Sequence, residues 1–270
     1  MIKKIIHIAD IHIRTYRMHM EYEEIFGLFI NEIKEHLKGY SYDEVRIAIV
    51  GDLVHQKITI SNEQLIVSCE FLSALAEIAK VILIAGNHDL LENNKDRIDS
   101  LTPMIRLLKN DNINYLKESK CYPDDNIVWC NYSIFEHNTP PNIADYKLSN
   151  EGDFTYIGLY HAPLVGASTD IGYQFSEGTS LEIFEGCNLV LLGDIHKRQV
   201  FYHKEIPIAY PSSLIQQNFG ETVSKHGYLI WDVETRSYTE HDIDTRYGFY
   251  NFKVTTLDDI ENGTEKLLNP

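Results

Sequence analysis

The feature that most constrains this chain is a series of five short apolar runs, each of which ends in a small polar cluster. Such runs are typical of buried strands, and segments with helical periodicity at 21–37 and 61–79 separate the first three. Strands that alternate with helices predict a parallel α/β sheet, in which the carboxyl ends of the strands meet at one edge. In chain order the clusters are Asp10-x-His12, Gly51-Asp52, Gly86-Asn87-His88-Asp89, His161 and Gly193-Asp194-x-His196. We therefore expect these side chains to form one site.

The second half of the chain has a different pattern. Short β segments without intervening helices follow the last cluster, and they favour an antiparallel arrangement. These segments are 200–202, 206–209, 228–233 and 238–243. The stretch 136–152 contains two adjacent prolines and several asparagines, which predicts a surface loop.

The residue types in the clusters indicate a metal site. Carboxylates, amide oxygens and neutral imidazoles suit Mn²⁺, Mg²⁺, Fe or Zn²⁺, and no cysteine belongs to the set. Two such ions about 3.5–4 Å apart can share a carboxylate and hold both the attacking and the leaving oxygen of a phosphoryl displacement. The pattern therefore predicts a dinuclear site that hydrolyses phosphoesters.

Charge and composition exclude other classes. The formal net charge of −16 excludes a basic protein that coats DNA. No apolar run reaches the roughly 18 residues of a membrane span, and the four cysteines are scattered as expected for reduced thiols. We expect a cytoplasmic protein, or one in the host-cell cytoplasm if a virus encodes it. We expect it to act at the nucleoid and to have no membrane association.

The ordered clusters resemble the motifs of the calcineurin-like metallophosphoesterase superfamily. Within it, Gly51-Asp52-Leu53-Val54-His55 is similar to a segment of the Mre-type double-strand-break repair nucleases, which include the bacterial SbcD subunit. Three later segments are also similar to this group. They are Asp194-Ile195-His196-Lys197-Arg198-Gln199, Tyr210-Pro211-Ser212-Ser213-Leu214 and Gln217-Asn218-Phe219-Gly220-Glu221. The resemblance extends over about residues 1–250.

This resemblance implies a fold and a set of metal ligands. The fold would be a two-sheet α/β sandwich flanked by helices, with the active site at the carboxyl ends of the strands. Two divalent ions would bind, with Mn²⁺ expected and Mg²⁺ as the alternative. The first would be held by Asp10, His12 and His196, with Asp52 as the bridge. Asn87, His161 and Asp194 would hold the second.

The resemblance also implies roles next to the metals. His88 would stand beside the scissile phosphate as the catalytic imidazole, and Asp89 would orient it. The expected DNA contacts are Arg14, Arg17, His55, Lys197 and Arg198.

One position departs from the family pattern. Asp194 stands where these proteins usually have His, so the second ion would gain a carboxylate in place of an imidazole. The added negative charge favours hard ions such as Mn²⁺ or Mg²⁺. The alternative is that Asp194 only caps a turn and that the second ion binds weakly.

The resemblance implies a metal-dependent DNA exonuclease or endonuclease of repair or recombination. Its expected partners are DNA ends, an SMC-like coiled-coil ATPase and a second copy of the chain. Residues 1–245 would form the nuclease domain, and 246–270 would begin a capping domain or a C-terminal extension. Two alternatives stay open: a metallophosphoesterase for small phosphodiesters or nucleotides, and a weakly catalytic scaffold subunit of a DNA-processing complex.

Overall fold

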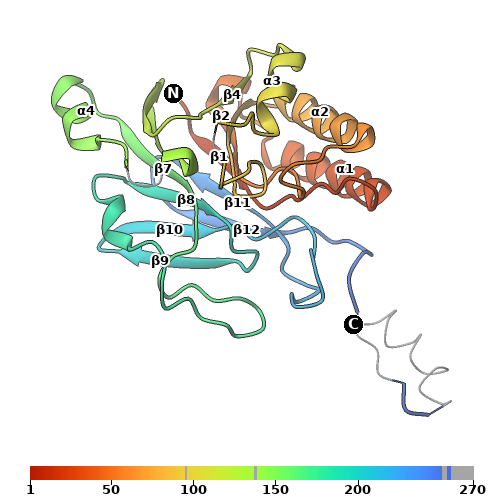
Figure 1. The fold of residues 1–270 in the computed structure, drawn as a ribbon. Helices are drawn as coiled ribbons and strands as arrows, with labels where there is room; N and C mark the ends of the chain where they lie inside the picture. Colours follow the sequence, from red (N-terminus) through yellow and green to blue (C-terminus); the bar gives the residue numbers. More distant parts are fainter. Residues whose placement is uncertain (95, 137–138, 251–253, 257–270) are drawn as a thin grey trace.

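In the computed structural model, two six-stranded sheets pack face to face, and the helices lie outside them (Figure 1). The structure describes residues 1–94, 96–136, 139–250 and 254–256. The strands of the first sheet are β1 (Lys4–Ile8), β2 (Val45–Val50), β3 (Lys80–Ile84), β4 (Ile113–Tyr115), β11 (Gly227–Asp232) and β12 (Tyr238–Asp242). Those of the second are β5 (Lys120–Asp124), β6 (Ile127–Tyr132), β7 (Thr155–His161), β8 (Leu189–Gly193), β9 (Gln199–His203) and β10 (Ile206–Tyr210). The helices are α1 (His19–His36), α2 (Asn62–Ala76), α3 (Leu101–Leu108) and α4 (Ile143–Ser149).

The order of strands is β12-β11-β1-β2-β3-β4 in the first sheet and β5-β6-β7-β8-β10-β9 in the second. β1 to β4 run parallel, as do β6, β7 and β8. The carboxyl ends of the central strands therefore meet at one edge of the sandwich. This arrangement confirms the predicted α/β two-sheet fold flanked by helices.

Successive side chains of β1 show how the layers form. Ile5 belongs to the core between the two sheets, whereas its neighbour Ile6 packs in the core beneath the helices. Because side chains alternate along a strand, a continuous apolar run supplies both faces of the sheet. In Figure 1, α1, α2 and α3 lie together outside the first sheet, and α4 lies beside the second.

Helix α2 begins where its sequence predicts. The hydroxyl of Ser61 accepts a hydrogen bond from the backbone N–H of Gln64 over 3.2 Å, which caps the helix. Phe71 of α2 stacks on Phe26 of α1, with 3.8 Å between the ring centroids. The two helices thus form one layer that supports the loops after β1 and β2.

Three expectations need correction or lie partly outside the described residues. The second half is not simply antiparallel, since β10 pairs parallel with β8 and β11 joins the first sheet beside β1. The stretch expected to be a loop at 136–152 contains α4, whose Ile143 is buried. The described residues between 246 and 256 form no strand, and the rest of 246–270 lies outside the described residues.

Where it is described, the chain contains no helix long and apolar enough to cross a membrane.

Candidate metal centre

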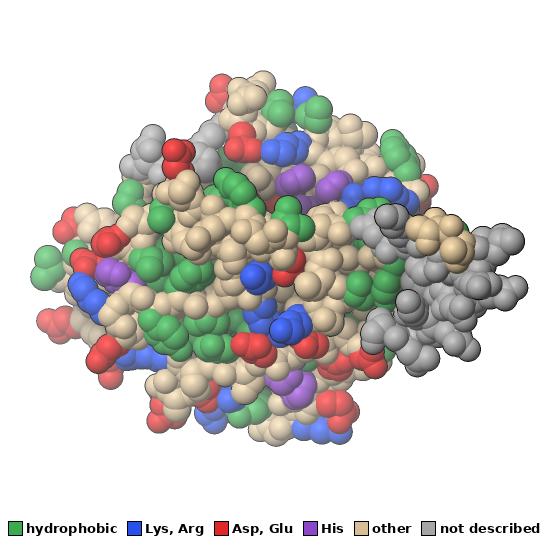
Figure 2. Space-filling view, turned by 90° about the horizontal axis from the view of Figure 1, so that it is seen from below, with side chains coloured by type: hydrophobic (Ala, Val, Ile, Leu, Met, Phe, Trp, Pro, Cys, Tyr) green, Lys and Arg blue, Asp and Glu red, His purple; other side chains and the backbone are tan. Residues whose placement is uncertain are grey.

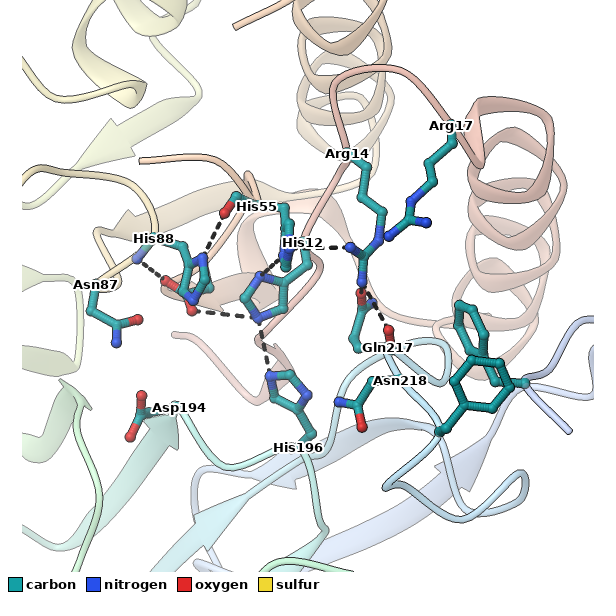
Figure 3. A pocket seen from close by; sticks show the side chains of 13 residues that line it. His12, Arg14, Arg17, His55, Asn87, His88, Asp194, His196, Gln217 and Asn218 are labelled. Carbon is teal, nitrogen blue, oxygen red and sulfur yellow. Dashed lines mark hydrogen bonds and ion pairs between the residues drawn. The ribbon is translucent and has the colours of Figure 1, made fainter. Parts of the chain in front are cut away.

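Five strands bring the predicted ligands together at their carboxyl ends. These strands are β1, β2, β3, β7 and β8, and each ends in one of the clusters identified in the sequence. Figure 3 shows the imidazoles of His12 and His196 facing each other, with Asn87 and Asp194 at the far end of the same cavity. The cavity has a volume of about 380 Å³. Its lining consists of His12, Arg14, Arg17, Asp52, His55, Asn87, His88, Asp194, His196, Gln217, Asn218, Phe219 and Phe249.

Three groups of three side chains have the spacing of metal ligands, and one of them consists of His12, His55 and His88. The other two contain the carboxylates. In Asp10, His12 and His196, one ligand atom from each lies within 4.8 Å of the others, and the same holds for Asp10, Asp52 and His161. The Oδ2 atom of Asp52 lies 3.4 Å from His12 Nε2 and 3.3 Å from His161 Nε2. One carboxylate oxygen of Asp52 therefore lies close to a histidine of each group, as a bridging ligand would.

Two buried polar atoms fit a cation. The Nδ1 of His161 donates to the carbonyl oxygen of Val50 over 2.8 Å, which leaves the lone pair on Nε2 free to bind a metal. That Nε2 is buried without a hydrogen-bond partner, and so is the side-chain oxygen of Asn87. Unsatisfied buried polar atoms are rare, and a divalent cation would satisfy both.

The electrostatics of the site also favour a cation. Burial raises the pKa of Asp10 to about 7. Burial lowers the pKa of His161, but the carboxylates of Asp52, Asp10 and Asp194 outweigh it and hold that pKa well above its usual value. Among the described residues, no Lys or Arg forms an ion pair with these three carboxylates. The site therefore stabilises positive charge at His161, and a bound cation would supply that charge in place of the proton.

The backbone holds four of the predicted ligands in left-handed conformations. The φ angles are 53° for Asp10, 53° for His12, 54° for Asp52 and 97° for Asp194. Such values are uncommon for residues other than glycine, and clusters of them mark functional sites. The turn after each strand is thus shaped to aim the ligand into the cavity.

Glycines make room for these ligands. A Cβ on Gly51 would overlap His161 Nδ1, and a Cβ on Gly86 would overlap the carboxylate of Asp52. A Cβ on Gly193 would overlap the carbonyl oxygen of Val50 and lie 2.6 Å from His161 Nδ1. The glycines in the sequence clusters are therefore required by the close approach of the ligands.

Asp194 lies within the site. Its Oδ1 is 3.8 Å from His161 Nε2, and its side chain is 19% exposed. Its backbone N–H donates to Asp10 Oδ1 over 3.0 Å, which holds the two carboxylate positions together.

His88 lies beside the metal ligands, but its surroundings differ from the expectation. Its backbone N–H donates to Asp52 Oδ1 over 2.8 Å, and its Nδ1 donates to the carbonyl oxygen of His55 over 2.5 Å. The carboxylate of Asp89 instead accepts from the backbone N–H groups of Gly86 at 2.8 Å and Val54 at 3.1 Å. The expectation that Asp89 orients the His88 ring is therefore corrected. Asp89 joins the loops after β2 and β3, because its buried carboxylate needs these donors.

The predicted DNA contacts fall into two groups. Arg14, Arg17 and His55 line the cavity, and Lys197 lines an adjoining hollow. Arg198 does not fit the prediction, because Nη1 binds the Asp242 carboxylate at 2.6 Å and its side chain is 8% exposed. Its guanidinium is held by Asp242 and by the carbonyl oxygen of His241, both on β12.

Glu221 is a site residue that the sequence reasoning missed. Its Oε1 lies 2.7 Å from His196 Nδ1, and its Oε2 accepts from the backbone N–H of Gln217 over 2.7 Å. Burial lowers the pKa of His196, but the hydrogen bond with Glu221 and the negative charges of Asp10, Glu221 and Asp52 together outweigh it and raise the pKa to about 9. The carboxylate fixes the ring so that Nε2 faces Asp10. The signal was present in the segment that ends at Glu221, which resembles a family motif.

The chain is 38% identical over 272 residues to an uncharacterized protein of Acanthamoeba polyphaga mimivirus, a match that covers 98% of the chain and 20% of that protein. It thus spans about a fifth of the length of this curated relative.

Two solved structures also align with this chain at low sequence identity. Phosphopantetheinyl hydrolase from Mycobacterium tuberculosis is 12% identical, with 77% of this chain and 88% of that chain covered and a TM-score of 0.45. The GAP50 anchor of the Plasmodium inner membrane complex is 12% identical, with 90% of this chain and 89% of that chain covered and a TM-score of 0.49.

The sequence model of calcineurin-like phosphoesterases matches residues 3–198, which is most of the chain and includes all the predicted metal ligands. The chain therefore belongs to the calcineurin-like phosphoesterase family.

Proposed function

We propose that this chain is a dinuclear metal-dependent phosphodiesterase that cleaves DNA. The observation that carries the proposal is the pair of ligand groups that share Asp10, with Asp52 Oδ2 between His12 of one group and His161 of the other. The backbone N–H of His88 donates to the other oxygen of the Asp52 carboxylate. Asp10, His12, His196 and Asp52 would hold one ion, and Asp52, Asn87, His161 and Asp194 the other. Divalent ions held by these residues would lower the pKa of the attacking water and neutralise charge on the phosphate.

The residues of the chain supply positioning and a proton. The carbonyl oxygen of His55 can only accept, so His88 carries its first hydrogen on Nδ1 and presents Nε2 to the substrate. A protonated Nε2 can donate to a phosphate oxygen as negative charge develops or transfer its proton to the leaving oxygen. Arg17 contributes positive charge to the same cavity, where it would attract a second phosphate of the strand.

Cleavage of end-labelled DNA with Mn²⁺, Mg²⁺ or EDTA tests this function. The native protein should cleave with Mn²⁺ and not with EDTA. The variant His88→Ala should still bind two ions per chain but cleave about 10²- to 10⁴-fold more slowly. His36→Ala, at an exposed position on α1, is the matched control and should cleave normally. Normal cleavage by His88→Ala would contradict the assigned role.

A second candidate is a phosphodiesterase for small diesters or nucleotides. The charge of −16 favours it, since a strongly acidic protein repels a long polyanion. Figure 2 shows acidic and basic side chains interspersed over the visible face, without a broad basic region. Hydrolysis of a nitrophenyl phosphodiester together with no cleavage of any DNA would favour this candidate.

The partners are also proposals. We infer an SMC-like coiled-coil ATPase and a second copy of the chain from the motif resemblance alone. Light scattering of the purified chain tests the homodimer. Co-purification from cells that express the chain with a matching ATPase tests the complex.

A further inference from the structure

An aromatic pair forms one wall of the cavity next to the metal ligands. The rings of Phe219 and Phe249 have their centroids 5.1 Å apart with an interplanar angle of 66°. Both line the cavity that also contains His88 and His196, and Phe219 is 57% exposed. A phenyl ring that is exposed next to charged ligands is not explained by the hydrophobic core.

Hydrogen bonds hold the backbone segments that carry both rings. Phe219 lies in the loop between Gln217 and Glu221, and Glu221 binds both Gln217 N–H and His196. The backbone of Phe249 exchanges two hydrogen bonds with the Gln216 amide, with lengths of 2.6 Å and 3.2 Å. The wall therefore has a fixed position relative to His196.

Positive charge stands in the same cavity. Arg14 and Arg17 lie on the same side of it, as Figure 3 shows. Arg14 is buried and bonds to the Gln217 carbonyl oxygen at 2.8 Å and to His55 at 3.1 Å. Arg17 is exposed, and within the described part of the chain no hydrogen bond or ion pair joins it. The cavity thus combines the proposed metal centre, the exposed guanidinium of Arg17 and the exposed phenyl ring of Phe219.

We propose that Phe219 and Phe249 form a nucleobase subsite, in which the base next to the scissile phosphate stacks on the exposed ring of Phe219. The inference rests on the proposed function and names its substrate class. Every base offers a π face, so stacking on a phenyl ring tolerates all sequences. A base can reach the ring only after it leaves the duplex stack. The substrate is therefore a single strand or a frayed end.

Binding of two single-stranded hexamers tests the subsite. One hexamer carries normal bases, and the other carries an abasic tetrahydrofuran residue at every position, with the same 3′ label. Dissociation constants are measured in the His88→Ala background with Mn²⁺ present, so that cleavage does not interfere. We expect the hexamer with bases to bind about tenfold more tightly than the abasic one, which corresponds to about 1.4 kcal/mol.

Variants of the wall make the test specific. Phe219→Leu should bring the ratio of the two dissociation constants close to one, and Phe219→Trp should keep or raise it. Tyr202→Leu removes an aromatic ring that is 63% exposed on β9, away from the cavity, and should leave the ratio unchanged. If Phe219→Leu does not fold, Phe219→Trp decides the test. A ratio of dissociation constants in Phe219→Trp that is lower than in the protein with Phe219 overturns the subsite.

The remaining outcomes separate this inference from the proposed function. No base preference, no binding of either hexamer, or the same preference in Phe219→Leu would overturn the subsite. Suppose that the protein with His88 intact cleaves both hexamers and that Phe219→Leu leaves the ratio of the two dissociation constants unchanged. This result would overturn the subsite but not the nuclease function. A preference that disappears in Phe219→Leu without any cleavage would support the subsite and refute the nuclease function.

Discussion

A buried histidine between the two sheets makes the stability of this protein sensitive to acid. His7 on β1 is fully buried, and its Nε2 donates to the carbonyl oxygen of Leu192 on β8 over 3.0 Å. Its Nδ1 can accept from the indole N–H of Trp231 at 3.5 Å. Burial lowers the pKa of His7 from 6.5 to about 3, against the smaller opposing effect of the Leu192 carbonyl. The folded protein therefore keeps this ring neutral at pH values where the unfolded chain protonates it.

The sign and the size of the effect follow from this difference. Between about pH 3 and pH 6.5 the unfolded chain binds one more proton at His7, so the free energy of unfolding falls as the pH falls through that range. The slope is about 1.36 kcal/mol per pH unit. Acidification from pH 7 to pH 5 should therefore remove about 2 kcal/mol through His7 alone, a large part of a typical stability of about 5–15 kcal/mol.

Urea unfolding of the metal-free protein at pH 7 and pH 5 measures this loss. Native protein should lose about 2 kcal/mol more than His7→Gln over this interval, whatever the stability of the variant at pH 7. Ile66→Gln, at an exposed position on α2, is the control, because it introduces the same side chain without removing a titratable group, and it should lose as much as the native protein. Equal losses in native protein and His7→Gln would refute the reasoning.

Other predictions concern the site and its supports. Glu221→Gln should weaken Mn²⁺ binding about 10- to 100-fold in calorimetry with little change in the urea midpoint, and an unchanged affinity would exclude a role in holding His196. Arg17→Ala should weaken DNA binding, most strongly at low salt. Arg198→Ala should lower the free energy of unfolding and leave DNA binding unchanged. Weaker DNA binding in Arg198→Ala and normal DNA binding in Arg17→Ala would contradict the placement of the two side chains. Gly193→Ala should destabilise the fold by about 1–3 kcal/mol in urea unfolding, because its Cβ would overlap a backbone carbonyl. The control Gly27→Ala, on α1 with nothing within 4 Å of its Cβ, should stabilise by about 0.5–1 kcal/mol.

The first half of the fold was predictable from the sequence because local patterns determine it. The apolar run of β2 and the capped helix after Ser61 lie where periodicity and capping predict them. The seven-residue helix α4 was missed because Pro140 and Pro141 precede it and Ile143 is its single buried residue. The parallel pairing of β8 with β10 was missed because the pairing joins strands with another strand between them in the chain, and no local pattern reports it.

The site was predictable in its residues but not in its contacts. The strand-end clusters identified the side chains from Asp10 to His196 that meet in the cavity. The direction of a side chain after a strand depends on the turn, so the bonds of Asp89 to backbone N–H groups were not predictable. The link between His196 and Glu221 spans 25 residues and exists only after the loop folds back.

The left-handed backbone of the predicted ligands limits which amino acids can replace them. Asp, Asn and His tolerate positive φ values better than bulky or β-branched residues do, and Asp194 has a φ of 97°. Asp and the His that the motif resemblance led us to expect at this position both belong to this small group. A single substitution at position 194 can therefore change the charge of the centre by one unit while the turn keeps its shape. Ion preference can then diverge between relatives by point mutation, with no insertion or rearrangement of the strands.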